Sequence, residues 1–136
     1  MNASFPSDDW LNMLEKKLNE DEKYNRVARN WEGDISITIE PSGKLTNKIF
    51  YYIGLWHGKC TRISPVEGPE FEKPEFKLAA TFDNITRILK GKLDPMQAML
   101  TRKLKVQGNM AYMMRNVPVV LDFVRCAREI TGEILE

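Results

Sequence analysis

The side chains best suited to covalent chemistry are His57 and Cys60, which lie three residues apart. An imidazole beside a thiol can deprotonate it and create a nucleophile, so the pair is a candidate thiol active site. The other interpretation is that both flank a strand reversal at Gly58 and that Cys60 is a small core residue, the usual role of a free cysteine. We favour the second interpretation and keep a thiol enzyme as an alternative.

Motifs of other catalytic and metal-binding classes are missing. His57 is the only histidine, which excludes a multi-histidine metal site. The sequence contains no Gly-x-Ser-x-Gly elbow, Walker loop or paired-cysteine knuckle. We therefore predict no catalytic residue, no metal and no cofactor.

The methionines are concentrated in one segment. Five of the seven fall between Met96 and Met114. Methionine is unbranched and polarizable, so such a cluster can line a cavity that accepts ligands of different shape. Ordinary core packing is the alternative explanation.

The charges are balanced over the whole chain but not along it. The net charge is +1, which gives no reason to expect nucleic acid binding. Between Lys73 and Arg128, however, there are 11 basic and 4 acidic residues. These cations could attract the carboxylate of a fatty acid, the phosphates of an acyl-coenzyme A or an anionic membrane surface. The head-group candidates, beside a predicted helix end, are Arg87, Lys90 and Lys92.

The cysteine usage and the first residues suggest a cytoplasmic protein. Cys60 and Cys126 are far apart, and the start of the chain is polar and acidic rather than like a signal peptide. No apolar stretch approaches the roughly 18 to 20 residues needed to cross a bilayer.

Hydrophobic periodicity predicts helices first and a meander of strands next. Residues 1–31 read as a region of amphipathic helices, the first of which can be capped by Ser7, Asp8 or Asp9. Residues 34–40 alternate strictly, which predicts a strand with one wet face. Two further strands are expected at residues 47–56 and 59–64, before an acidic, proline-containing loop.

The second half alternates strands with short helices. A strand at 75–82 leads into a helix capped by Asp83, and Asp94 with Pro95 starts another. A fifth strand holds Leu104 and Val106, and Pro118 opens a last amphipathic helix whose pattern extends to residue 135. The predicted class is α+β, with helices gathered over one sheet.

The stretch from Leu89 to Met114 resembles the sterol carrier protein 2 family. The matching residues are Gly91, Lys92, Leu93, Asp94, Pro95, Ala98, Lys103, Leu104, Lys105, Gly108 and Asn109. The resemblance implies a five-stranded mixed sheet covered by helices, enclosing an apolar tunnel for a fatty acid, fatty acyl-coenzyme A or sterol. Arg102 departs from the glycine that family members often carry before the Lys-Leu-Lys strand.

We therefore predict one lipid-carrying domain over residues 1–136, with residues 118–135 as a helical lid. The expected apolar wall consists of Phe82, Met96, Met99, Leu100, Met110, Met113, Met114, Val120, Phe123 and Val124. Dimerisation through residues 1–31 is left open. The main alternative is a ligand-free regulatory or scaffold module that binds another protein.

Overall fold

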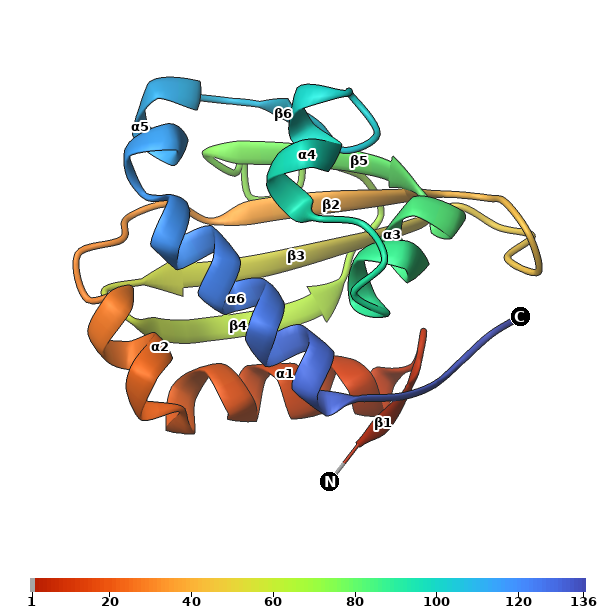
Figure 1. Cartoon of the computed structure of the whole chain (residues 1–136), viewed down its shortest axis with the longest axis horizontal. Coiled ribbons are helices and arrows are strands. Elements are labelled where there is room, and N and C mark those ends of the chain that lie inside the picture. Colours follow the sequence, from red (N-terminus) through yellow and green to blue (C-terminus); the bar gives the residue numbers. More distant parts are fainter. Residues whose placement is uncertain (1) are drawn as a thin grey trace.

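A five-stranded mixed sheet forms the centre of the computed structural model, which describes residues 2–136 (Figure 1). The strand order is β4-β3-β2-β5-β6. Strand β2 pairs in parallel with β5, and every other neighbouring pair in this sheet is antiparallel. The strands are β2 (Ile35–Glu40), β3 (Ile49–Trp56), β4 (Lys59–Pro65), β5 (Phe76–Thr81) and β6 (Lys105–Gln107). The predicted fold class is confirmed.

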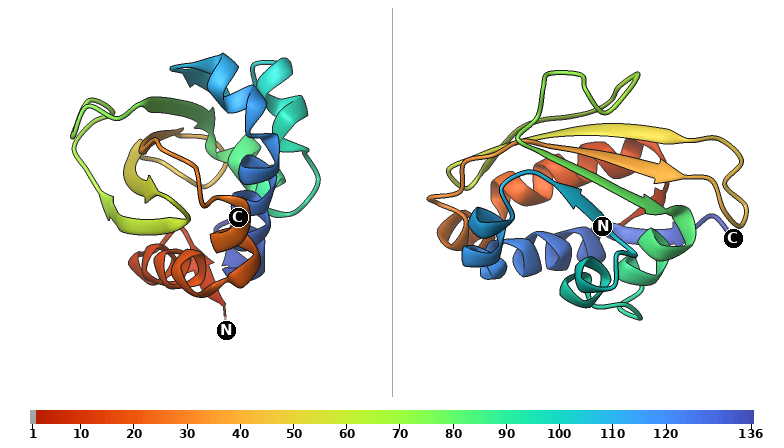
Figure 2. Two further views of the ribbon diagram at one scale, coloured as in Figure 1. Left: turned by 90° about the vertical axis from the view of Figure 1, so that its left-hand side faces the viewer. Right: turned by 90° about the horizontal axis from the view of Figure 1, so that it is seen from above.

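The helices gather over one face of the sheet, and residues 66–75 cross the other (Figure 2). The helices are α1 (Asp8–Glu20), α2 (Glu22–Val27), α3 (Phe82–Leu89), α4 (Pro95–Leu100), α5 (Met110–Arg115) and α6 (Val117–Ile130). Their starts follow local capping chemistry. Ser7 caps α1, and Asp94 accepts hydrogen bonds at the start of α4 with Pro95 in its first turn, both as predicted. Thr81, not Asp83, caps α3.

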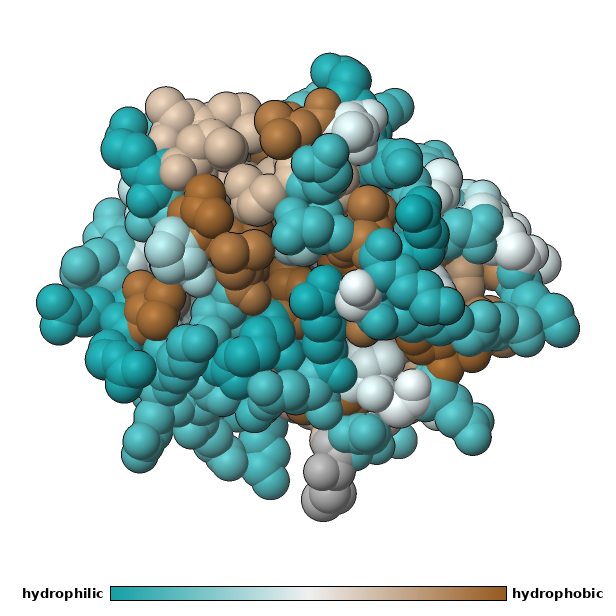
Figure 3. Space-filling view, viewed as in Figure 1, coloured by the Kyte–Doolittle hydropathy of each residue, from teal (hydrophilic) through white to brown (hydrophobic). Residues whose placement is uncertain are grey.

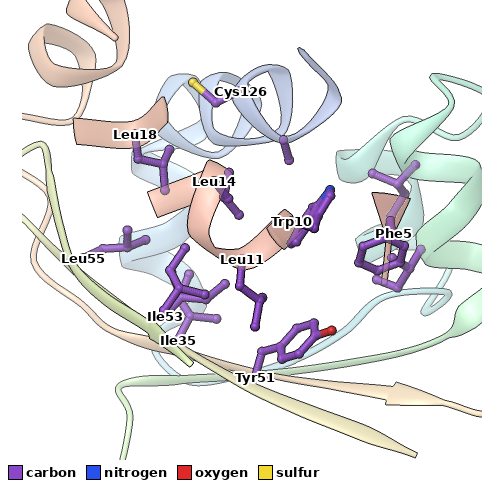
Figure 4. Close-up of a cluster of buried hydrophobic side chains, with 14 of the residues drawn as sticks. Phe5, Trp10, Leu11, Leu14, Leu18, Ile35, Tyr51, Ile53, Leu55 and Cys126 are labelled. Carbon is purple, nitrogen blue, oxygen red and sulfur yellow. The ribbon is translucent and has the colours of Figure 1, made fainter. Parts of the chain in front are cut away.

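The two ends of the chain pair with each other. Strand β1 (Ala3–Phe5) lies parallel to β7 (Thr131–Ile134). Helix α6 therefore ends at Ile130, before the position that its apolar pattern suggested. Thr131 holds this end in place, because its hydroxyl accepts a 2.8 Å hydrogen bond from the Trp10 indole. The core between α1, α6 and the sheet is continuous with this terminal pair (Figure 4).

The expectation that β2 has one wet face is wrong. Ser36 and Thr38 are 1% and 7% exposed. The loop at residues 66–75 closes over this face, and its end is tied to the start of β2 by a 2.8 Å hydrogen bond from the Glu75 amide to Asp34. Alternation thus located the apolar face, but it did not show that a distant loop crosses the polar one.

Candidate functional site

An apolar pocket of about 130 Å³ lies between the sheet and the helices. Its wall is entirely apolar. The strands and the Trp31 segment contribute Trp31, Ile35, Ile37, Ile39, Tyr51, Ile53, Leu55 and Leu78. The rest of the wall is Phe5, Trp10, Leu14, Ile85, Ile88, Leu89, Pro95, Met99, Leu104, Met113, Val119, Val120, Phe123, Val124 and Ala127. A site of this kind can hold hydrocarbon, but it offers no polar surface to a charged group.

The floor of the pocket is set by strand register. Alternation turns Ile35, Ile37 and Ile39 to the same side of β2. Pairing then places Tyr51 of β3 and Leu78 of β5 on either side of Ile37. Burial raises the pKa of the Tyr51 phenol to about 12, so the group is neutral at physiological pH.

The wall is closed at one side and close to the surface at the other. Leu14 and Ala127, from α1 and α6, are buried. Met99 of α4 and Val120 and Val124 of α6 are only partly buried. The pocket therefore approaches the outside beneath α4 and α6, which lie on the front face of the molecule in Figure 1. We call this side the mouth.

The structure brings together half of the predicted wall residues. Met99, Met113, Val120, Phe123 and Val124 line the pocket. The other five do not: Leu100, Met110 and Met114 are exposed, Met96 is partly buried, and Phe82 is buried against Phe5 with ring centroids 5.9 Å apart. Neighbouring residues of a short helix point to different sides, so a cluster in sequence divides between inside and outside.

The head-group candidates lie around the C-terminal end of α3, and none lines the described pocket. Lys90 forms an ion pair with Glu136 at 2.5 Å. Arg87 and Lys92 are exposed. The turn that follows α3 places Gly91 at a φ of +77°.

Sequence reasoning missed the contribution of the N-terminal third. Trp10 and Leu14 of α1 and Trp31 line the pocket together with the three isoleucines of β2. The alternation of those isoleucines was a usable signal, since it marked the face that the helices cover. The inward role of α1 had no local signal, because any amphipathic helix shows the same stripe.

The surroundings of His57 and Cys60 do not favour a catalytic pair. The His57 Nε2 atom lies 2.6 Å from a carboxylate oxygen of Glu32. Cys60 is buried, and its backbone amide donates a 2.8 Å hydrogen bond to the Asn19 side chain. Burial raises the pKa of the Cys60 thiol to about 12, which opposes thiolate formation. These contacts favour a structural role for both residues.

One cluster of acidic and sulfur groups in residues 2–136 has metal-ligand proximity, and it consists of Asp21, Asp122 and Cys126. Its carboxylates are engaged by Arg125, which lies 2.6 Å from Asp21 and 2.8 Å from Asp122. Hydrogen bonding by this guanidinium is the main cause that holds the pKa of Asp21 far below its usual range. The arrangement is an ion-pair network between helices, in which Arg125 and Lys23 neutralise the two carboxylates.

The helices of residues 2–136 lack the features of a membrane span. Within residues 2–136, none is both long enough and apolar enough to cross a bilayer.

Comparisons with known proteins agree with the fold. The family model of the SCP-2 sterol transfer family matches residues 11–120. A crystal structure of sterol carrier protein 2 is 27% identical, with a TM-score of 0.82 over 92% of this chain and 98% of that one. No curated protein gives a significant match.

Two further solved structures come from named organisms. A conserved hypothetical protein from Thermus thermophilus, a suggested sterol carrier protein, is 27% identical, with a TM-score of 0.82 over 93% of this chain and 89% of that one. A sterol carrier protein 2 from Aedes aegypti, in complex with palmitate, is 20% identical, with a TM-score of 0.54 over 88% of this chain and 94% of that one. At that identity it shows the fold alone.

Proposed function

The chain belongs to the SCP-2 sterol transfer family, and from this premise we propose that it binds and carries one apolar ligand between the sheet and the helices without covalent chemistry. The observation that supports the proposal most strongly is the pocket wall, which is apolar throughout. A buried wall that presents no polar atom to the pocket selects hydrocarbon and leaves a polar head group at the mouth. The proposed ligand-binding residues are therefore the lining side chains, including Met99, Met113 and Val124.

We propose a fatty acid as the simplest ligand of this kind. Burial of about fifteen methylenes at roughly 0.8 kcal/mol each gives on the order of 12 kcal/mol, against association costs of about 4 to 15 kcal/mol. Palmitate in the Aedes aegypti relative supports this ligand class. A fatty acyl-coenzyme A would place the same chain inside and its charged part outside. The basic side chains Arg87, Lys90 and Lys92 are the proposed partners of such a head group.

The pocket must widen to accept a long chain. Its volume of about 130 Å³ is close to that of an engineered cavity of about 150 Å³ that binds benzene, and typical ligand sites are about 300 to 1,000 Å³. We propose that the pocket extends into a tunnel when the cover at the mouth moves outward.

The cover that we assign to this movement is α5 with the first turns of α6. Helix α5 has six residues and one buried side chain, Met113. Tyr112 also attaches this helix: its hydroxyl accepts a 2.8 Å hydrogen bond from the Glu32 amide, and its ring lies 5.1 Å from that of Trp31 and 6.3 Å from that of Phe76. The second half of α6 is less able to move, because Cys126 and Ala127 are buried and Arg125 is ion-paired to Asp21. The lid role proposed for residues 118–135 therefore belongs to the start of that range.

A fluorescent fatty acid displaced by palmitate provides the test. Val124→Phe places a larger ring at a lining position, and we expect it to weaken binding about tenfold, equivalent to about 1.4 kcal/mol. Val66→Phe makes the same change outside both the lining and the cover, in the loop on the other face of the sheet, and we expect affinity close to that of the unmodified protein. Thermal unfolding checks that both variants are folded.

Two results would contradict the proposal. One is the absence of saturable fatty acid binding by the unmodified protein, together with no lipid-sized mass retained in native mass spectrometry after purification from cells. This outcome would favour the scaffold alternative. The other is rapid Cys60 modification near neutral pH that is lost in His57→Ala, which would favour the thiol enzyme.

A further inference from the structure

The mouth of the pocket is surrounded by exposed apolar side chains. Leu100 is 72% exposed, Met114 is 46% and Leu121 is 42%, and Met110 is exposed beside them on α5. Figure 3 shows apolar side chains gathered over α5, the adjoining part of α6 and the region of α4. Single exposed leucines are ordinary, but a contiguous group of this kind marks an interaction surface.

These exposed side chains alternate with the pocket lining. Leu100, Met114 and Leu121 each follow a residue that lines the pocket, and those lining residues are Met99, Met113 and Val120. Each of the three helices thus turns one side chain inward and the next outward. The surface group and the pocket wall are two sides of the same thin cover, and whatever the surface touches lies directly over the mouth.

The segment that carries this surface has charges of one sign. Residues 95–121 contain four cations and no Asp or Glu. Arg102 and Lys103 follow α4, and Arg115 ends α5. These three side chains are exposed, and none forms an ion pair with a carboxylate in the described part of the chain. They are free to face an anionic partner.

We propose that this surface, formed by Leu100, Met110, Met114 and Leu121 with Arg102, Lys103 and Arg115, docks on an anionic lipid bilayer. Flexible apolar side chains enter the boundary between head groups and acyl chains, and the cations contact lipid phosphates and carboxylates. The inference rests on the proposed function and extends it, because docking places the mouth against the membrane. A ligand can then pass between bilayer and pocket without crossing water.

A bilayer matches these features better than a protein partner does. Methionine and arginine occur at both kinds of surface, but the exposed group at the mouth contains no tyrosine or tryptophan, the usual anchors of protein interfaces. Unpaired cations at the edge of an apolar surface are typical of interfacial membrane binding. Docking of this kind weakens as salt screens the charges.

Vesicle sedimentation tests the inference on the full-length protein. We expect binding to phosphatidylcholine vesicles that contain phosphatidylserine, weaker binding to phosphatidylcholine alone, and loss of binding as salt is raised. The triple variant Arg102→Glu, Lys103→Glu, Arg115→Glu should reduce binding about tenfold or more, since each cation near an anionic surface contributes measurably. Leu100→Ala with Leu121→Ala should reduce binding at any salt concentration.

The matched control reverses three exposed cations on the N-terminal helices and the turn that follows them, with the substitutions Lys16→Glu, Arg26→Glu and Arg29→Glu. It has the same net charge as the first variant, and we expect less than about a twofold loss of vesicle binding. Equal losses in the two triple variants would overturn the proposed surface. The proposed surface would also be overturned if the unmodified protein bound fatty acid in solution but did not sediment with phosphatidylserine vesicles. In that case the proposed function would stand. Both triple variants should retain affinity for the fluorescent fatty acid.

Discussion

The helical layer has a tightly packed side and a loosely packed side. On the first side, α1, α2 and the second half of α6 bury Leu14, Leu18 and Cys126 completely. Ion pairs between α1, α2 and α6 join these helices. On the second side, α4 and α5 are six residues long and expose Leu100, Met110 and Met114. Both sides contribute to the wall of one pocket.

The difference indicates a division of roles. The packed side supplies most of the stability, since buried apolar area is the main favourable term in folding. The loose side can open at low cost, because segments with few buried side chains have small opening free energies. A carrier needs both properties. It must stay folded while its ligand enters and leaves.

The largest expected contrast is between two leucines. Leu18→Ala on the packed side should lower the free energy of unfolding by about 3 kcal/mol, because it leaves a cavity in close-packed surroundings. Leu100→Ala on the loose side should change it by less than about 0.5 kcal/mol, because that side chain is in water. Urea unfolding measures both values. Similar losses in the two variants would remove the distinction between the sides.

The ion-pair network gives the next largest effect. Arg125→Met leaves Asp122, which is 5% exposed, with only the Lys23 amine at 3.6 Å. We expect a loss of about 2 kcal/mol, since removal of one partner leaves a buried charge poorly compensated. Arg115→Met on the loose side is the matched control and should be close to neutral. A neutral result for Arg125→Met would show that the network does not hold α6 in place.

Lowering the pH should reduce the stability of the packed side before that of the loose side. Hydrogen bonds from Arg125 and Lys17 keep the pKa values of Asp21 and Glu129 below their usual range. The unfolded state therefore binds more protons than the folded state below about pH 5, and stability falls by about 1 to 2 kcal/mol as the pH decreases toward 2. Urea unfolding across this range should show a smaller decrease in Arg125→Met. An equal decrease would mean that other carboxyl groups are responsible.

The sequence predicted the sheet well because its signals are local. Alternation marked the inward isoleucines of β2, and Asp94 with Pro95 marked the start of α4. The fold class followed from the order of these elements and from the motif at Leu89–Met114. The match of the family model to residues 11–120 shows the same relationship.

The division of the methionine cluster could not be read from the sequence. Helices of six residues are too short for periodicity to decide which neighbour faces inward, as with Met113 and Met114. The end of α6 at Ile130 depends on pairing between β7 and β1, which lie at opposite ends of the chain. The face of β2 that carries the buried Ser36 is crossed by a loop from a later part of the chain, residues 66–75. Contacts of this range leave no local pattern.

Hydrogen exchange with and without palmitate tests the central claim most directly. In the free protein the amides of α5 should exchange faster than those of α1, because α5 opens without global unfolding. Saturating palmitate should slow exchange in α5 and the first turn of α6 and leave α1 unchanged. Bound palmitate with no change at α5, or with equal protection of α1 and α5, would contradict a pocket that opens beneath this cover.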